Sequence, residues 1–255
     1  MSYVTPKKSL GQHFLRDKNI AEKIVQNLNP KETENIIEVG PGTGILTGIL
    51  IDKKLNPYLI EIDRESVVYL KAKFPSTDKK IFHADFLDFP LSDKFSQPVS
   101  IVGNFPYNIS SQIFFKILEN RNIVREVVCM VQKEVGLRIA ETPGNKVYGI
   151  TSVLLQAFYD IQYLFTVSEK AFTPRPNVKS AVIRLKRNKT EKLECNEKLF
   201  FNVVKTAFNQ RRKTLRNSLQ NLLKNKNLPE EILKKRPEEL SVQDFVNLTR
   251  LLEGQ

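Results

Sequence analysis

Apolar and polar positions follow a repeating order along the first two-thirds of the chain. A short apolar run is followed by a turn of polar residues or glycine, and then by a stretch whose apolar residues have helical spacing. This pattern predicts strands over 35–39, 58–63, 80–85, 99–102 and 127–131, and helices over 17–28, 64–73, 110–119 and 133–140, with another helix beginning at residue 45. Because strands and helices alternate, we expect an α/β fold with a mostly parallel sheet.

The pattern changes toward the carboxyl terminus. Residues 150–163 read as a helix running into a strand, and residues 179–185 alternate as a further strand. The composition turns polar over 186–194, and apolar residues then recur with helical spacing through the basic stretch 210–219 and up to residue 252. We therefore predict two domains, an α/β domain over 1–187 and a basic helical domain over 188–255.

Four of the predicted strands should end at one sheet edge, the first in a glycine turn and the next three in polar groups. The first breaks into the turn Gly40-Pro41-Gly42-Thr43-Gly44, where glycines let a ligand approach the backbone. Its Gly-x-Gly-x-Gly spacing, after the acidic Glu38, differs from the Gly-x-Gly-x-x-Gly of dinucleotide sites. Glu61 follows Gly40 by 21 residues and fits a carboxylate that accepts from ribose hydroxyls. A solvated carboxylate at the strand end is the alternative for Glu61.

The next two strand ends carry further candidates. Asp85 is placed to accept from the amino group of a cofactor adenine, whereas Asp88 is more typical of a turn. After the strand at 99–102 comes Asn104-Phe105-Pro106-Tyr107. Pro106 limits the conformations of Phe105, so two acceptors, the Asn104 side-chain oxygen and the Phe105 carbonyl, stand beside the flat ring of Tyr107. This combination suits a flat base with an exocyclic amino group. A turn with a packed tyrosine is the alternative.

Composition adds a polyanionic partner to this picture. The 255 residues carry a net charge of +12, with a pI near 9.6, which favours nucleic acid. Between residues 198 and 229 there are eight Lys or Arg and no Asp or Glu. We expect phosphate binding by the densest part of this run, Arg211, Arg212, Lys213 and Arg216.

Little in the sequence supports a disulfide-rich, metal-binding or membrane protein. The two cysteines, Cys129 and Cys195, do not form a disulfide framework, and no Cys/His cluster has metal-ligand spacing, so we expect no metal. No signal peptide and no apolar stretch of about 20 residues is present. We therefore expect a cytoplasmic protein without a membrane partner, and nothing in the sequence suggests more than a monomer.

These motifs together resemble one family, the small-subunit ribosomal RNA adenine dimethyltransferases, which methylate two adjacent adenines near the 3′ end of that RNA. The resemblance covers nearly the whole chain and is carried by Leu10-Gly11-Gln12-His13-Phe14-Leu15, the stretch 38–44, Glu61-Ile62-Asp63, the stretch 103–110, Ala171-Phe172-Thr173-Pro174 and the stretch 207–219. The last stretch is the most specific, because we do not expect a basic helix there in relatives that methylate large-subunit RNA.

The resemblance implies a fold, a cofactor and site residues. The fold would be a Rossmann-like class I methyltransferase with a mostly parallel seven-stranded sheet and a small all-helical carboxyl-terminal domain. S-adenosylmethionine would be the methyl donor and 16S RNA, in the small subunit or its precursor, the partner. The cofactor contacts would be His13, Leu15, Gly40, Glu61, Asp85 and Asn104, with Gly42 in the same turn. Members often have Asn at position 13, and a His there would add a pH dependence. Phe105 stands where other members have Leu.

The resulting hypothesis for catalysis needs no general base in the motif. The side-chain oxygen of Asn104 and the carbonyl of Phe105 would accept the two amino hydrogens, so that the nitrogen lone pair faces the methyl group. Tyr107 would stack on the base, and Phe172 would either cover its other face or be a core residue. The alternatives are a large-subunit methyltransferase of the antibiotic-resistance type, a DNA methyltransferase, for which a target-recognition domain is missing, and a ribosome-assembly factor. The glycine spacing excludes a nicotinamide oxidoreductase.

Overall fold

The computed structural model describes residues 4–29, 35–223 and 228–254. The chain divides into two compact units. The sheet unit comprises Met1–Gly136 and Ile161–Arg187, and the helical unit comprises Leu137–Asp160 and Asn188–Gln255. Residues 137–160 thus group with the carboxyl-terminal helices, although they precede the predicted boundary at residue 187. The functional division into a catalytic and an RNA-binding domain stays a prediction.

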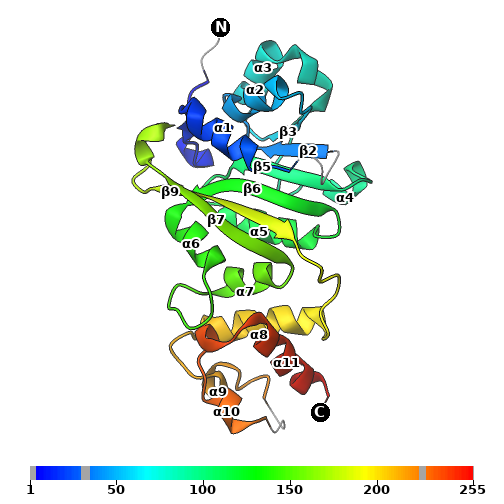
Figure 1. The fold of residues 1–255 in the computed structure, drawn as a ribbon, viewed down its shortest axis with the longest axis vertical. Coiled ribbons are helices and arrows are strands. Elements are labelled where there is room, and N and C mark those ends of the chain that lie inside the picture. Colours follow the sequence, from blue (N-terminus) through cyan, green and yellow to red (C-terminus); the bar gives the residue numbers. More distant parts are fainter. Residues whose placement is uncertain (1–3, 30–34, 224–227, 255) are drawn as a thin grey trace. The chain divides into compact units, whose positions relative to one another are not determined.

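A seven-stranded sheet organises the first unit (Figure 1). Its strand order is β4-β3-β2-β5-β6-β9-β7. The strands are β2 (Asn35–Val39), β3 (Tyr58–Glu61), β4 (Ile81–His83), β5 (Val99–Asn104), β6 (Val124–Gln132), β7 (Tyr159–Val167) and β9 (Ser180–Arg187). Neighbours from β4 to β6 pair in parallel, and β9 is antiparallel to β6. This is the mostly parallel sheet that we expected, with β2, β3, β4 and β5 ending at one edge.

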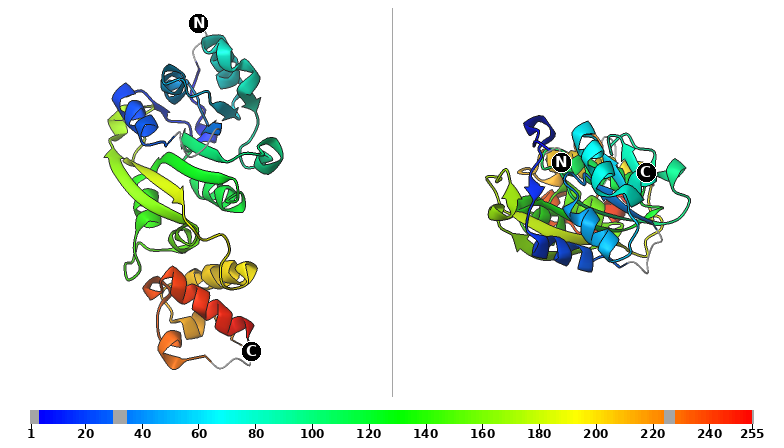
Figure 2. Two further views of the ribbon diagram at one scale, coloured as in Figure 1. Left: turned by 45° about the vertical axis from the view of Figure 1, so that its right-hand side comes forward. Right: turned by 90° about the horizontal axis from the view of Figure 1, so that it is seen from above.

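Helices cover both faces of this sheet. Figure 1 and Figure 2 show α1 (Lys18–Gln26), α2 (Ile45–Asp52) and α3 (Arg64–Lys73) on one face and α5 (Ser110–Glu119) on the other. The remaining helices near the sheet are α4 (Leu91–Lys94) and α6 (Lys133–Ala140). The side chain of Asp17 caps α1 by accepting from the Ile20 N–H at 3.2 Å. The sequence pattern therefore located the beginning of α1 correctly, but the helix ends two residues before Leu28.

A two-stranded sheet brings distant segments of the chain together. β1 (Phe14–Leu15) pairs antiparallel with β8 (Phe172–Thr173), so Leu15 lies opposite Phe172. Both side chains are buried in the core with apolar residues of α1, α2, β5 and β6. Burial of this apolar surface anchors the amino-terminal segment on the sheet unit. Short 3₁₀ helices lie at Lys8–Leu10, Pro75–Lys80 and Glu169–Ala171.

The helical unit contains α7 (Ile150–Gln156), α8 (Glu197–Asn209), α9 (Leu215–Ser218), α10 (Glu230–Leu233) and α11 (Val242–Glu253), with a 3₁₀ turn at Pro237–Glu239. Its core holds Phe200, Val204, Phe208 and Phe245. The basic helix expected over 207–219 is interrupted, because α8 ends at Asn209 and α9 starts at Leu215. The chain turns between them, where the Lys213 N–H donates to the Gln210 carbonyl at 2.8 Å, and the buried Leu215 anchors the next helix.

Two further features of the described residues bear on other functions. None of the helices in these ranges is long and apolar enough to cross a membrane. In the same ranges, no group of three or more His, Cys, Asp or Glu side chains is arranged to hold a metal ion.

Candidate functional site

A pocket of about 240 Å³ opens at the carboxyl edge of the sheet. Each of four neighbouring strands delivers one predicted residue to its wall: Gly40 after β2, Glu61 at the end of β3, Asp85 after β4 and Asn104 at the end of β5. Parallel strands place their carboxyl ends together, which is where open α/β folds bind ligands. The structure therefore brings together the residues that the sequence singled out at separate strand ends.

The glycine turn is shaped for close approach of a ligand. Gly40 has a φ of +66°, and among the described residues no heavy atom lies within 4 Å of the position that a Cβ would occupy. Gly42 has a φ of +55°, and a Cβ there would lie 2.7 Å from the ring of Phe14. Side chains at either position would be strained, so the turn keeps its bare backbone toward the pocket.

The Glu61 carboxylate is fixed by two backbone donors. One oxygen accepts from the Gly42 N–H and the other from the Asp63 N–H, both at 2.9 Å. The side chain is buried, and this burial, only partly opposed by the two N–H donors, raises the pKa of Glu61. A carboxylate has further lone pairs, so it can still accept from the hydroxyl groups of a ligand.

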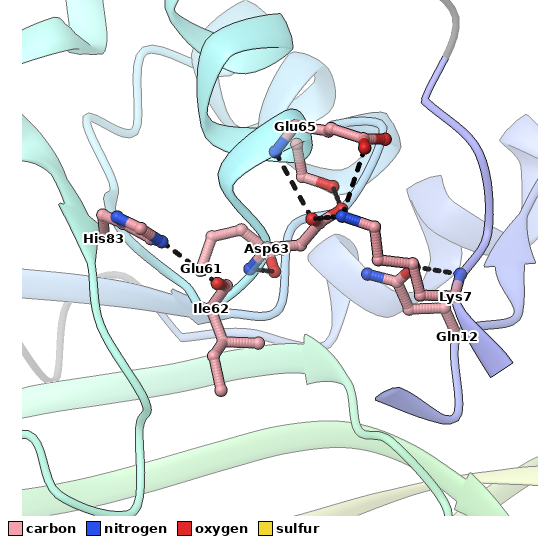
Figure 3. A network of polar contacts seen from close by, with 8 residues as sticks. Lys7, Gln12, Glu61, Ile62, Asp63, Glu65 and His83 are labelled. Carbon is pink, nitrogen blue, oxygen red and sulfur yellow. Dashed lines mark hydrogen bonds and ion pairs between the residues drawn. The ribbon is translucent and has the colours of Figure 1, made fainter. Parts of the chain in front are cut away.

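An ion pair ties the amino-terminal segment to the turn after Glu61 (Figure 3). The Lys7 ammonium lies 2.5 Å from the Asp63 carboxylate and 3.3 Å from that of Glu65. The backbone N–H of Lys7 donates to the Gln12 side-chain oxygen at 2.8 Å. Burial alone would raise the pKa of Asp63, but its hydrogen bonds, first that from Lys7, hold the pKa below its ordinary value. Residues 9–14 line the pocket just beyond this pair.

Within the described ranges, the side-chain amide of Asn104 forms a hydrogen bond through its nitrogen but not through its oxygen. Its Nδ2 donates to the His13 carbonyl at 2.8 Å, which fixes the orientation of the amide. Its Oδ1 is buried, and no donor among the described residues reaches it. A buried acceptor without a donor is unfavourable, so its presence in a pocket wall points to a ligand that donates there.

Phe105 sets the backbone beside Asn104. Its ring is 1% exposed and packs against Phe114 with centroids 5.8 Å apart, and its N–H donates to the Met130 carbonyl at 3.0 Å. In the described part of the chain no hydrogen bond is formed to its own carbonyl oxygen. With Pro106 following, this carbonyl is a second fixed acceptor in the pocket wall.

Tyr107 presents a positioned ring. Its hydroxyl lies 2.5 Å from the Ser180 hydroxyl at the start of β9, and its ring stacks on His13 with centroids 5.5 Å apart and planes at 27°. His13 is held in turn by a contact of 2.7 Å between its Nδ1 and the Pro174 carbonyl. Burial raises the pKa of the Tyr107 phenol, which stays protonated at neutral pH. The ring therefore offers a flat apolar face to the pocket.

Two predicted residues lie away from the pocket wall. Leu15 and Phe172 do not line it, and both belong to the core beneath β1 and β8. Phe172 is 4% exposed. Of the two interpretations left open for Phe172, the structure favours the core residue, because a side chain packed in this way has little surface to offer a base.

Several residues of the pocket escaped prediction. Ile62, 45% exposed, directly follows Glu61, and Phe86 and Leu87 directly follow Asp85. Their apolar side chains form walls beside the polar strand ends. Their position in the sequence could have indicated them, because in this fold class a residue next to a strand-end carboxylate lies at the same edge of the sheet.

The basic residues of the helical unit differ in their surroundings. Arg211 donates to the Lys146 carbonyl and lies 4.0 Å from the Glu238 carboxylate, and Arg216 pairs with Glu230. Arg212 and Lys213 are exposed at the turn between α8 and α9. The predicted cluster therefore contains two residues with partners inside the helical unit, Arg211 and Arg216, of which Arg216 is also exposed, and two exposed residues at the turn, Arg212 and Lys213.

Glu38, the acidic residue before the glycine turn, is an internal structural group. It is 1% exposed and accepts from the Thr47 hydroxyl at 2.6 Å. Burial raises its pKa from 4.5 to about 8, against the hydrogen bond from Thr47 and with added repulsion from Glu61. Between pH 4.5 and about pH 8 the Glu38 side chain therefore stays protonated in the folded protein, whereas in the unfolded chain it has released this proton. The free energy of unfolding therefore falls as the pH rises through this window.

Replacing Glu38 with Gln is expected to remove this pH dependence. The variant cannot ionise at this position. Between pH 5 and pH 8 its stability should therefore rise relative to that of the unmodified protein, by on the order of 2–4 kcal/mol in the free energy of unfolding. Urea denaturation at both pH values measures this difference. Glu119→Gln, at an exposed position of α5, serves as the control that should show no such change. Equal effects of Glu38→Gln at both pH values would contradict the prediction.

Comparisons with known proteins bear on the family to which the chain belongs. The sequence profile of a family described as ribosomal RNA adenine dimethylase matches residues 4–253. The chain is 52% identical over 256 residues to ribosomal RNA small subunit methyltransferase A of Flavobacterium johnsoniae, covering 100% of this chain and 98% of the relative. It is also 52% identical over 260 residues to the protein of the same name in Cytophaga hutchinsonii, with 100% of both chains covered.

Solved structures show the fold. A crystal structure of a dimethyladenosine transferase from Plasmodium falciparum superposes with a TM-score of 0.76 at 23% identity, covering 92% of this chain and 96% of that one. The 23S rRNA methyltransferase ErmE superposes with a TM-score of 0.68 at 23% identity, covering 93% and 99%. At this identity both confirm the predicted class I methyltransferase fold alone. The sequence match over nearly the whole chain carries the assignment further: the chain belongs to the ribosomal RNA adenine dimethylase family.

Proposed function

We propose that the chain transfers methyl groups from S-adenosylmethionine to the exocyclic amino groups of two adjacent adenines near the 3′ end of small-subunit ribosomal RNA. The relatives named for small-subunit RNA, about half identical over the full length, support this substrate. The observation that carries the proposal is the buried, unpartnered Oδ1 of Asn104 in the pocket wall, because an amino group is the donor that it lacks.

The residues of the pocket fit the methyl donor. Glu61 would accept from its ribose hydroxyls, Asp85 from its adenine amino group, and the exposed Ile62 offers an apolar surface for the adenine. The open space at Gly40 and the segment that carries His13 would accommodate the rest of the cofactor. When bound, S-adenosylmethionine supplies an electrophilic methyl group on a sulfonium. The chain's own groups then have to orient the amine.

Asn104 and Phe105 perform that orientation. An adenine amino nitrogen is a poor nucleophile because its lone pair is delocalised into the ring. The Asn104 Oδ1 and the Phe105 carbonyl would accept its two hydrogens and favour a pyramidal nitrogen whose lone pair points at the cofactor. Both acceptors are held rigidly, Asn104 through its bond to the His13 carbonyl and Phe105 through its buried ring, so little reorganisation is needed.

Replacing Tyr107 with Ala is expected to lower methyl transfer about tenfold to a hundredfold, because the stacking of a base on an aromatic ring is worth roughly 1–3 kcal/mol. Tyr107→Phe keeps the ring and loses only the contact with the Ser180 hydroxyl, so it should retain most of the activity. Initial rates with saturating cofactor measure both variants. Near-normal turnover by Tyr107→Ala would remove the ring from the mechanism.

Replacing Lys7 with Met is expected to raise the KM for S-adenosylmethionine about threefold to tenfold while kcat changes less. The ion pair with Asp63 holds residues 9–14 over the pocket, so its loss should speed cofactor dissociation. Lys7→Arg should restore the KM, and Lys8→Met, a change at the exposed neighbour, is the matched control. If Lys7→Met and Lys8→Met give the same KM, the ion pair does not position the segment.

The RNA partner would be engaged by exposed basic residues of the helical unit. Arg212 and Lys213 are exposed at the turn between α8 and α9, and we assign phosphate contacts to them first. Arg211 and Arg216 have partners within the unit, so they would contribute by holding the turn as well as by their charge. We expect the chain to act as a cytoplasmic monomer.

Transfer of labelled methyl groups to under-methylated 30S subunits and, in parallel, to large-subunit RNA tests the proposal. Mapping of the product should find dimethyladenosine at two adjacent positions of the small-subunit RNA alone. Label in the large-subunit RNA would instead indicate the activity of the resistance methyltransferases. Binding to 30S subunits without any transfer would indicate an assembly factor.

A further inference from the structure

The sheet unit contains a second cavity, of about 350 Å³. It is lined by residues of the amino-terminal segment, β1, the glycine turn, α2, α3 and β8, among them Phe14, Arg16, Thr43, Tyr69, Lys73 and Thr173. Phe14 lines both this cavity and the pocket at the sheet edge, so the two are neighbours. The volume lies at the lower end of the range of about 300–1,000 Å³ that small-molecule sites occupy.

The charged side chains in the wall of this second cavity are all basic. Arg16 and Lys73 both line it, and none of the ten described residues in its wall is acidic. The Lys73 ammonium is held in place, donating to the Thr43 carbonyl at 3.0 Å and lying 5.2 Å from the ring centroids of both Tyr69 and Phe74. Two of its three N–H donors remain for a ligand. The cavity is therefore suited to an anionic group.

The rest of the wall is suited to something flat and partly apolar. Tyr69 projects a half-buried ring from α3, and Ile45 and Val4 add apolar surface. Thr43 and Thr173 carry hydroxyl groups that can donate and accept. An anion beside a flat, hydrogen-bonding group is the chemistry of a nucleotide, with the phosphate at the cations and the base against the aromatic ring.

We propose that the second cavity is a nucleotide subsite, which holds a residue of the RNA flanking the adenine in the sheet-edge pocket. The phosphate lies at Lys73 and Arg16 and the base at Tyr69. The shared lining residue Phe14 places this cavity beside the sheet-edge pocket, so a nucleotide that flanks the target adenine in the same strand is favoured over a free mononucleotide. The inference rests on the proposed function in one respect, that the substrate is RNA.

Ultraviolet crosslinking of the full chain to a short single-stranded RNA, followed by mass spectrometry, tests the location. The tryptic peptide of residues 65–71, which contains Tyr69, should carry a nucleotide adduct. Fluorescence anisotropy then measures affinity for the same RNA. Tyr69→Ala and Lys73→Ala should each weaken binding about fivefold to twentyfold, and Lys73→Ala should also reduce the salt dependence by roughly one phosphate contact.

Matched variants separate the subsite from general effects. Tyr69→Phe and Lys73→Arg should bind as the unmodified protein does, and Lys71→Ala removes a charge from the same helix outside the cavity and should also leave affinity unchanged. S-adenosylmethionine affinity should be unaltered in the two Tyr69 variants and in Lys71→Ala, and Lys73→Arg, which keeps a donor for the Thr43 carbonyl of the glycine turn, controls for the loss of that bond in Lys73→Ala. If Tyr69→Ala and Lys73→Ala bind RNA as tightly as Lys71→Ala, the subsite does not exist. Because this readout is binding, failure of methyl transfer by the unmodified protein would reject the proposed function separately.

Discussion

Replacing Asn104 with Ala is expected to lower the rate of methyl transfer by about 100- to 1,000-fold, the range seen when one preorganised hydrogen-bonding group is lost from an active site. The substitution removes the only buried side-chain acceptor in the described pocket wall that lacks a donor, and it also releases the His13 carbonyl from its bond to Nδ2. The effect should fall mainly on kcat, because the acceptor acts on the amine as its nitrogen becomes pyramidal.

Asn104→Asp distinguishes the two ends of this side chain. It keeps an acceptor toward the pocket but replaces the donor to the His13 carbonyl with an oxygen, so the amino-terminal segment should be repelled. We expect this variant to raise the KM for the cofactor as well as to lower kcat. Single-turnover rates and calorimetric cofactor binding, with melting temperatures as the folding control, measure the two variants. Transfer by Asn104→Ala within about tenfold of normal would contradict the mechanism.

Replacing Glu61 with Gln is expected to raise the KM for S-adenosylmethionine about 10- to 100-fold with little change in kcat at saturation. Hydrogen bonds to charged groups are worth about 1.5–3 kcal/mol. A glutamine has one acceptor oxygen, whereas Glu61 accepts from Gly42 and Asp63 with separate oxygens. The NH₂ of the variant would face a backbone N–H, so the side chain would turn away from the ribose hydroxyls.

The pH dependence of cofactor binding gives Glu61 a distinct signature. Burial raises its pKa, so protonation begins at a higher pH than for an ordinary glutamate. Since the ionised form is the better acceptor, cofactor affinity should fall as the pH is lowered through that raised pKa. The Gln variant should bind weakly and show no such fall. A pH profile that is identical in both proteins would exclude Glu61 as the titrating acceptor.

Sequence patterns predicted the sheet and its polar edge because both follow from local periodicity. The apolar runs that became β2, β3 and β5 each end next to a polar residue or glycine, and parallel pairing then brings Gly40, Glu61 and Asn104 together. No long-range information is needed for that step beyond the alternation of strands and helices. The same reasoning located the glycine turn and the acceptors beside Tyr107.

Contacts between distant segments were beyond this reasoning. Nothing local indicates that Lys7 pairs with Asp63, or that Leu15 lies opposite Phe172 in a two-residue ladder. The basic stretch has apolar residues at helical spacing, yet Leu215 is buried in a separate short helix, so the chain turns at 210–214 where a continuous helix was expected. Tertiary packing outweighs helix propensity at such positions.

The structure of a complex with S-adenosylhomocysteine and a short RNA that contains the two target adenines tests the central claim most directly. We expect one adenine amino nitrogen to lie about 3 Å from both the Asn104 Oδ1 and the Phe105 carbonyl, with the adenine ring over Tyr107. An adenine held elsewhere, with Oδ1 bonded to water or to the cofactor, would contradict it.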